Sequence, residues 1–143
     1  MPDTTLMSET ILFAGLDDDA LAKVVEAGRD LEMLRGDVLF REGDDPDELF
    51  VVVSGRIAIA NKSIDGRESM VALMEEGDLF GEMGLFDGRG RSAEARALET
   101  SVVTAVPYAP VRSLYEDDPA LLWRVVAMLA GRLRTMDTAL ADS

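Results

Sequence analysis

The chain has 143 residues, of which 48% are hydrophobic, and this suits one domain with an apolar core. Asp and Glu number 28 against 14 Lys and Arg, so the net charge of −14 would make the surface as a whole repel a DNA duplex or an anionic membrane. The absence of cysteine and histidine excludes disulfides, iron–sulfur clusters, Cys/His zinc sites and nucleophiles activated by histidine.

The sequence also argues against a membrane span, a secretion signal and a calcium loop. No apolar run reaches the length of about 18 residues that a spanning helix needs, and the N-terminus MPDTTLMSET lacks a basic start. The acidic stretch 43–48 lacks the spacing of a calcium loop. We therefore expect a cytoplasmic protein without a metal site.

The N-terminal part begins with a polar lead, residues 1–10, and we expect the domain to occupy residues 11–143. A helix is predicted after Asp17, because an aspartate caps a helix and acidic residues in the first turn favour its positive end. Gly28 can end this helix. Its apolar stripe consists of Leu21, Val24 and Val25.

From Leu31 to Val106 the apolar residues recur with a period of two. Short segments of this kind, separated by Gly- and Asp-containing turns at a spacing of roughly 8–12 residues, predict a β-sandwich or β-roll. The pair Asp65-Gly66 predicts a tight hairpin of type I′, which needs two positive φ angles. The expected strands are 31–34, 38–42, 48–53, 56–60, 69–74, 93–98 and 101–107.

The C-terminal part is expected to be helical, first as a short turn over 111–119 and then as a long helix over 119–140. Apolar residues recur in the long helix at alternating steps of four and three, which is typical of a coiled-coil seam. We therefore expect a homodimer about a two-fold axis, the alternative being a helix buried within one domain. The seam consists of Leu122, Val126, Leu129, Leu133, Met136 and Leu140. A neighbouring flank, expected to pack on the strands, consists of Leu121, Val125 and Met128.

The segment FGEMGLFDGRGRSAEARA, residues 80–97, has the residues of an anion site. A helical turn starting near Gly81 would present free backbone N–H groups, Arg91 offers a planar fork of donors that matches a phosphate, and Ser92 adds a hydroxyl. Glu82 would repel a phosphate, but a carboxylate accepts well from a sugar hydroxyl. The segment thus predicts a ligand with a phosphate and a ribose. The alternative is a simple ion pair between Glu82 and Arg91.

This segment resembles the phosphate-binding cassette of cyclic-nucleotide-binding domains, whose pattern is roughly F-G-E-[LM]-[AG]-L, a short variable loop, and R-[SAT]-A. The upstream stretch RGDVLFREGDDPDELFVVVSGRIAI is similar to the glycine-punctuated strands of the same family, and the likeness runs from about Leu12 to Leu140. The resemblance implies a mainly β fold with flanking helices, a double-stranded β-helix or jelly-roll-like β-roll. It also implies a bound cyclic nucleotide, either cAMP or another such as cGMP.

Site roles follow from the resemblance. It implies that Gly81 leaves room at the sugar-phosphate and that Glu82 accepts from the ribose 2′-hydroxyl. It also implies that Arg91 pairs with the cyclic phosphate, helped by Ser92 and by backbone amides up to Gly84. The residues expected to line the pocket are Leu73 and Met83.

The last helix resembles the dimer helix of the bacterial CRP/FNR-type regulators, in which the nucleotide base reaches polar residues of this helix, often from both subunits. Met136 and Asp137 stand roughly where cAMP-binding members have adjacent hydroxyl residues, so the candidates here are Thr135 and Thr138. The alternative for both threonines is ordinary helix surface.

The expected function is a cyclic-nucleotide sensor rather than an enzyme. The CRP/FNR-type regulators continue into a helix-turn-helix domain, and this chain stops about where that domain would be joined. We therefore expect the effector-binding part of a transcription regulator, whose DNA binding would come from the added domain and not from this chain alone. The alternatives are a stand-alone sensor that controls a partner protein and a dimerisation module whose pocket no longer binds nucleotide.

Overall fold

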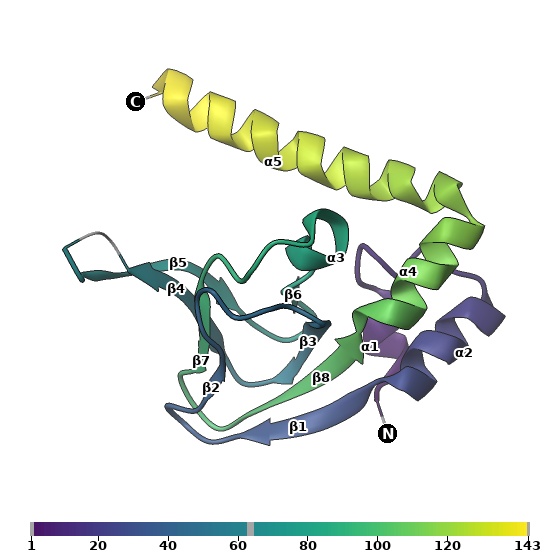
Figure 1. Ribbon diagram of the computed structural model, residues 1–143, viewed down its shortest axis with the longest axis horizontal. Helices are drawn as coiled ribbons and strands as arrows, with labels where there is room; N and C mark the ends of the chain where they lie inside the picture. Colours follow the sequence, from purple (N-terminus) through teal and green to yellow (C-terminus); the bar gives the residue numbers. More distant parts are fainter. Residues whose placement is uncertain (1, 63–64, 143) are drawn as a thin grey trace.

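The strands of this chain form a roll with several helices at one end and the long last helix running above it, as the computed structural model of residues 2–62 and 65–142 shows (Figure 1). The helices are α1 (Thr4–Ser8), α2 (Asp18–Ala27), α3 (Met83–Asp87), α4 (Tyr108–Asp117), the 3-10 turn η1 (Pro119–Leu121) and α5 (Leu122–Asp142). The strands are β1 (Arg29–Met33), β2 (Val38–Phe40), β3 (Glu48–Ser54), β4 (Ile57–Lys62), β5 (Glu68–Met74), β6 (Leu79–Phe80), β7 (Glu94–Ala97) and β8 (Ser101–Pro107).

The strands make two antiparallel sheets, with the orders β1-β8-β3-β6 and β2-β7-β4-β5. The inner faces of both sheets share one apolar cluster, which includes Phe50, Val52, Ile57, Phe80, Ala95 and Val103. The predicted β-roll with flanking helices is therefore confirmed. Strand β3 of the first sheet pairs with the short β6, and the chain that leaves β6 enters α3 after two residues.

A second apolar cluster joins the helices to β3 and β8. Its fully or nearly fully buried members include Met7, Phe13, Val25, Leu49, Val106, Val111, Tyr115 and Val125. The predicted N-terminal helix is confirmed as α2, since the Asp17 carboxylate accepts a hydrogen bond of 2.8 Å from the Ala20 backbone N–H. Gly28 caps the other end, with φ −80° rather than a left-handed angle.

The structure differs from the sequence-based expectations in several places. The expected turn over 111–119 is the longer helix α4, which starts at Tyr108, and the long helix expected over 119–140 starts only at Leu122, after η1. Residues 1–10 form more than a polar lead, because α1 lies there and Met7 is fully buried. The boundary at residue 11 stays a prediction. Strand β6 was not expected, since two residues show no period; its pairing with β3 creates it. The β4–β5 hairpin forms, but no described non-glycine residue has a positive φ, so Asp65 does not complete a type I′ turn beside Gly66, whose φ is +84°.

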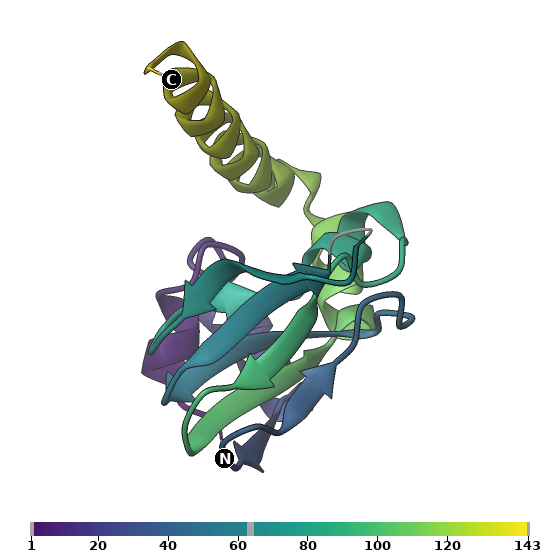
Figure 2. The ribbon, with the colours of Figure 1, turned by 90° about the vertical axis from the view of Figure 1, so that its left-hand side faces the viewer.

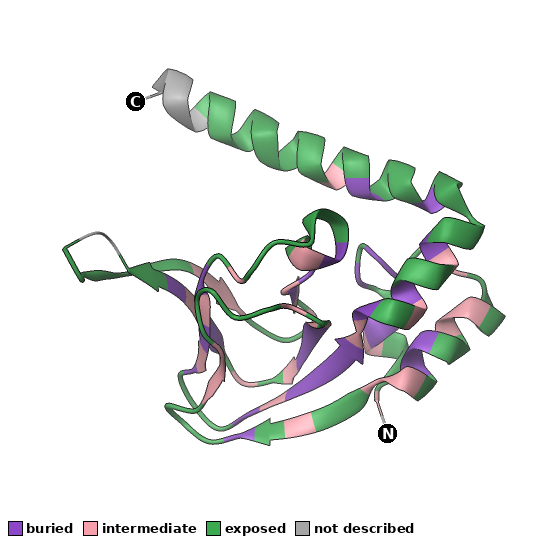
Figure 3. Cartoon of the chain, viewed as in Figure 1, coloured by how far each residue is buried: buried purple, intermediate pink, exposed green. Residues whose placement is uncertain are grey.

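Helix α5 leaves the body of the protein and projects past the strands (Figure 2). Leu121, just before it, and Val125 are buried and Met128 is half-buried against the second cluster, as the flank was predicted to be. The described members of the seam are exposed: 39% for Leu122 and between 46% and 60% for the others (Figure 3). The side chain of Leu140 lies outside the described residues. Among the described helices, none is long and apolar enough to cross a membrane.

A glycine in the β3–β4 turn gives the first prediction. Gly55 has φ +88°, and a Cβ there would overlap the Ser101 side chain and lie 2.7 Å from its Cα. We expect Gly55→Ala to lower the free energy of unfolding by about 1–2 kcal/mol for the left-handed backbone and about 1–3 kcal/mol more for the overlap. Urea denaturation measures the total loss of unfolding free energy. Gly36→Ala is the control, because Gly36 has φ +91° with open space around it. Equal losses in the two variants would contradict the prediction.

Candidate functional site

The backbone of Arg91 is fixed by the loop that precedes β3. The Arg91 N–H donates to the carbonyl oxygen of Asp44, and the Gly43 N–H donates to the carbonyl oxygen of Arg91, both at 2.8 Å. These two bonds turn the side chain of Arg91 inward, beneath the segment that joins β6 to α3. The arginine that the sequence singled out is thus half-buried and not directed into bulk water.

Every hydrogen-bond acceptor around the Arg91 guanidinium is neutral. Nη1 donates to the Gly81 carbonyl at 2.8 Å and to the Tyr108 hydroxyl at 3.3 Å, and Nη2 donates to the Glu48 carbonyl at 2.6 Å. The ring face of Phe40 lies 4.1 Å from the guanidinium carbon. Within the described residues Arg91 has no ion pair, and its Nε is buried without a hydrogen-bond partner.

Tyr108, the first residue of α4, supports the same carbonyl. Its hydroxyl donates a short hydrogen bond to the Gly81 oxygen. Burial raises the pKa of Tyr108, the Arg91 charge lowers it to a lesser degree, and Glu82 raises it further. The phenol therefore remains a donor at neutral pH.

Two of the four glycines of the cassette, Gly81 and Gly84, are required by close packing. Gly81 has φ +78°, and a Cβ there would lie 2.9 Å from the Arg91 Nη1 and 3.2 Å from the Phe50 ring. A Cβ on Gly84 would overlap Pro46. Larger residues would separate α3 from the loop before β3, so the glycines allow the start of α3 to pack against Arg91 and Pro46.

Glu82 is almost completely buried, with 5% of its surface exposed, and it stands at the N-cap position of α3. A buried carboxylate requires a partner. The partner is Arg132 of α5, whose Nη2 lies 3.3 Å from the Glu82 Oε1. The alternative of a simple ion pair between Glu82 and Arg91 is therefore wrong.

Arg132 is a site residue that the sequence analysis missed. The signal was present, because Arg132 follows the buried Val125 and the half-buried Met128 at helical spacing and so lies on the same face of α5. The next residues near this face are Thr135 and Met136, whereas Thr138 lies about 120° around the helix from Arg132. The Thr135 hydroxyl donates to the Gly131 carbonyl at 3.0 Å.

The remaining predicted ligand residues differ in their exposure. Ser92 and Met83 are exposed, and Leu73 is half-buried on β5. The structure thus brings Gly81, Glu82, Gly84 and Arg91 together and adds Arg132. The roles of all these residues toward a ligand remain predictions.

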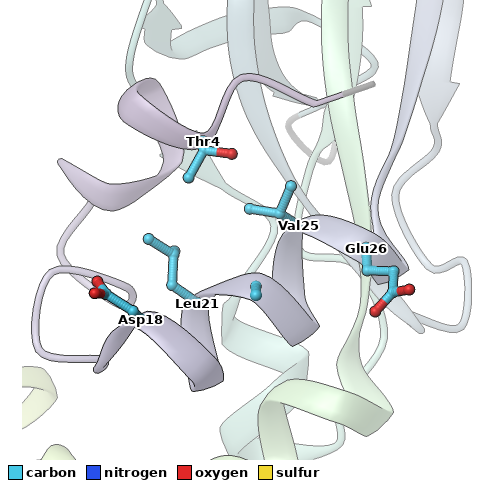
Figure 4. Close-up of a pocket in the computed structure, with 6 residues that line it drawn as sticks. Thr4, Asp18, Leu21, Val25 and Glu26 are labelled. Atoms are coloured by element: carbon cyan, nitrogen blue, oxygen red, sulfur yellow. The ribbon is translucent and has the colours of Figure 1, made fainter.

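Two surface cavities lie away from Arg91. One of about 420 Å³ lies between α1 and α2, where apolar side chains stand beside the carboxylates of Asp18 and Glu26 (Figure 4). The other, of about 520 Å³, is lined by residues of α3 and α4 and by Leu122. The first offers carboxylates where a phosphate would need donors. Within the described residues, no cluster of three or more acidic side chains could hold a metal ion.

Comparison with known proteins gives concordant matches. The family model described as "Cyclic nucleotide-binding domain" matches residues 31–118. A CRP-like cAMP-activated global transcriptional regulator of Mycobacterium tuberculosis is 28% identical over 137 residues, which cover 96% of this chain. The same alignment covers 61% of that relative, so the chain spans less than two thirds of its length.

Two solved structures are similar to this chain. The N-terminal domain of a transcriptional regulator from Streptomyces coelicolor A3(2) has a TM-score of 0.73 and 32% identity, covering 94% of each chain. The regulatory domain of Toxoplasma gondii PKA, co-crystallised with cAMP, has a TM-score of 0.74 and 27% identity, covering 77% of this chain and 42% of that one.

The two tyrosines give the second prediction, since they account for all tyrosinate absorbance of the chain. Burial raises the pKa of Tyr115 to about 12 and raises that of Tyr108 above its usual 10. The unfolded chain therefore loses protons first, and stability that is complete below pH 10 is lost as the pH rises from about 10 toward 12. Absorbance titrations of folded and urea-denatured protein test this. Tyr115→Phe should remove the later of the two ionisations, and identical titrations in both states would contradict the prediction.

Proposed function

Because the chain belongs to the cyclic nucleotide-binding domain family, as its sequence predicted, we propose that it is the cAMP-sensing part of a CRP/FNR-type transcription regulator. The observation that carries the proposal is the half-buried Arg91 guanidinium, which has only neutral partners among the described residues. A buried charge without a counter-ion is costly. An anion beside Arg91 supplies the missing charge.

The donors of Arg91 suit a cyclic phosphodiester. Of its five N–H groups, three are engaged by Gly81, Tyr108 and Glu48, which leaves Nε–H and one hydrogen of Nη2. Guanidinium forks of this kind bind phosphate oxygens in two-point fashion. Ser92 and the amides at the start of α3 add neutral donors. The net charge of −14 does not prevent this, because it is spread over the surface and screened within about 8–10 Å at ordinary salt.

The charge and position of Glu82 determine the orientation of the ligand. As a carboxylate it accepts hydrogen bonds only, so it repels the phosphate and receives the ribose 2′-hydroxyl instead. The phosphate then lies toward Arg91 and the sugar toward α5, because Arg132 of α5 contacts Glu82. Leu73 and Met83 would line the apolar side of the pocket.

The base would extend toward the face of α5 beyond Arg132. Thr135 and Met136 stand there, and Thr138 would reach a base only from another direction. The names of relatives favour cAMP, since the mycobacterial protein is described as cAMP-activated and the Toxoplasma domain was crystallised with cAMP. cGMP is the competing ligand that titrations must include.

The exposed seam of α5 supports a homodimer. Five large apolar side chains in a row along one helix face, each at least 39% exposed, are costly in water. Their steps of four and three match those of a second copy of the same helix in a coiled coil. The two-fold axis would run along the seam, beside the face that carries Arg132.

The contact between Arg132 and Glu82 suggests how a ligand acts on α5. A ligand shifts a conformational equilibrium only by binding its two states differently. When a ribose hydroxyl donates to Glu82, it changes the contact between Glu82 and Arg132. It thereby changes how firmly α5 is attached to the rest of the domain. In a full-length regulator this motion would reposition a DNA-binding domain; in a stand-alone sensor it would act on a partner protein.

The role of Arg91 is tested by its removal. We expect Arg91→Ala to weaken cAMP binding by about 2–4 kcal/mol, because the phosphate loses its charged partner. Isothermal calorimetry with cAMP and cGMP measures the change. Arg89→Ala removes an exposed arginine from the same loop and is the matched control, with an expected change within error.

Two results would overturn parts of the proposal. An unchanged dissociation constant in Arg91→Ala would refute the role of Arg91. A wild-type protein that binds neither nucleotide would favour the dimerisation module whose pocket has lost its ligand.

The dimer is tested by a charge in the seam. We expect Leu129→Glu to shift the protein from dimer to monomer, since two carboxylates would face each other across the axis. Sedimentation velocity measures the mass. Ala127→Glu places the same charge on an exposed position off the seam and should remain dimeric. A wild-type monomer, or an unchanged mass in Leu129→Glu, would refute the seam.

A further inference from the structure

Three phenylalanines from three strands stack on one another, and two of them, Phe40 and Phe50, lie against the Arg91 guanidinium. The ring of Phe40 stacks on Phe50 with 5.7 Å between centroids, and Phe50 stacks on Phe80 at 5.5 Å. We call this group the aromatic platform. Its Phe40 ring is the closest to Arg91, at 4.1 Å from the guanidinium carbon, against 5.6 Å for Phe50.

An irregularity in β2 places Phe40 there. Val38 pairs with Arg96, but Phe40 pairs with Ala95, so two steps along β2 correspond to one step along β7. Such a bulge redirects the following side chain. All three residues of β2 are half-buried, without the alternation of a regular strand.

The chemistry of the platform differs from that of a carboxylate partner. A carboxylate would neutralise Arg91, occupy its N–H groups and compete with a phosphate. A ring face attracts the cation through its quadrupole and uses none of its N–H groups. The guanidinium is thus held in place with its charge uncancelled, and two of its donors, Nε–H and one Nη2 hydrogen, have no protein partner among the described residues.

We propose that Phe40 is a positioning residue for the ligand site, because its ring face holds the Arg91 guanidinium in the orientation that receives the cyclic phosphate. The inference rests on the proposed function, since it concerns the affinity of the same site. Phe40 is the ring of the platform nearest to the arginine, whereas Phe80, 3% exposed, stacks on Phe50 and serves the core.

Calorimetry with cAMP compares Phe40→Leu, which keeps an apolar side chain but removes the ring, with Phe40→Tyr, which retains it. We expect Phe40→Leu to weaken cAMP binding by about three- to thirty-fold and Phe40→Tyr to stay within about two-fold of the wild type. In an Arg91→Ala background, followed by NMR titration at high ligand concentration, Phe40→Leu should cost nothing further. Thermal unfolding verifies that all variants are folded.

Equal affinity of Phe40→Leu and wild type would overturn the proposal. So would an equal loss in the Arg91→Ala background, because a packing role alone would produce it.

A measurement without ligand separates this inference from the proposed function. In the free protein the ring current of Phe40 should shift the Arg91 side-chain protons upfield, and the shift should vanish in Phe40→Leu and persist in Phe40→Tyr. Absence of the shift in the wild type overturns the role of Phe40 even where cAMP binds. A normal shift in a wild-type protein that binds no cyclic nucleotide overturns the proposed function, while the contact between Phe40 and Arg91 stands.

Discussion

The inward-turned guanidinium of Arg91 is the interaction around which this end of the molecule is organised. It joins the carbonyl oxygens of Gly81 and Glu48 and the hydroxyl of Tyr108, which belong to three segments far apart in the chain. A single side chain thereby fixes the start of α3 against β3 and α4. Because all three partners are neutral, the contact organises the backbone without cancelling the positive charge.

The inward position of Arg91 also explains why the site needs residues without polar side chains around it. Gly81 and Gly84 allow α3 to approach Arg91 and Pro46, and Phe50 fills the space beneath. The chain has twice as many acidic as basic residues, yet the described part of it places none of the carboxylates in an ion pair with Arg91. The positive charge is kept by the arrangement of neighbours, not by the overall composition.

Local signals in the sequence were sufficient to predict most of the fold and about half of the candidate site. The cap at Asp17, the strand periods and the cassette with Gly81, Glu82 and Arg91 are all readable within short windows. The missed features depend on distance: β6 exists because β3 pairs with it, and Arg132 meets Glu82 across 50 residues of chain. Phe40 reaches Arg91 through a bulge, which no periodic pattern reveals.

The manner in which α5 is attached has a mechanical consequence. The helix is embedded in the apolar cluster only near its start, and Arg132 is its one ion pair with the rest of the described chain. With 21 residues it is about 30 Å long. A tilt of about 10° at the embedded end therefore displaces the far end by about 5 Å at that rise per residue. Because Arg132 lies about half-way along the helix, any displacement of its contact with Glu82 is about doubled at the far end of α5.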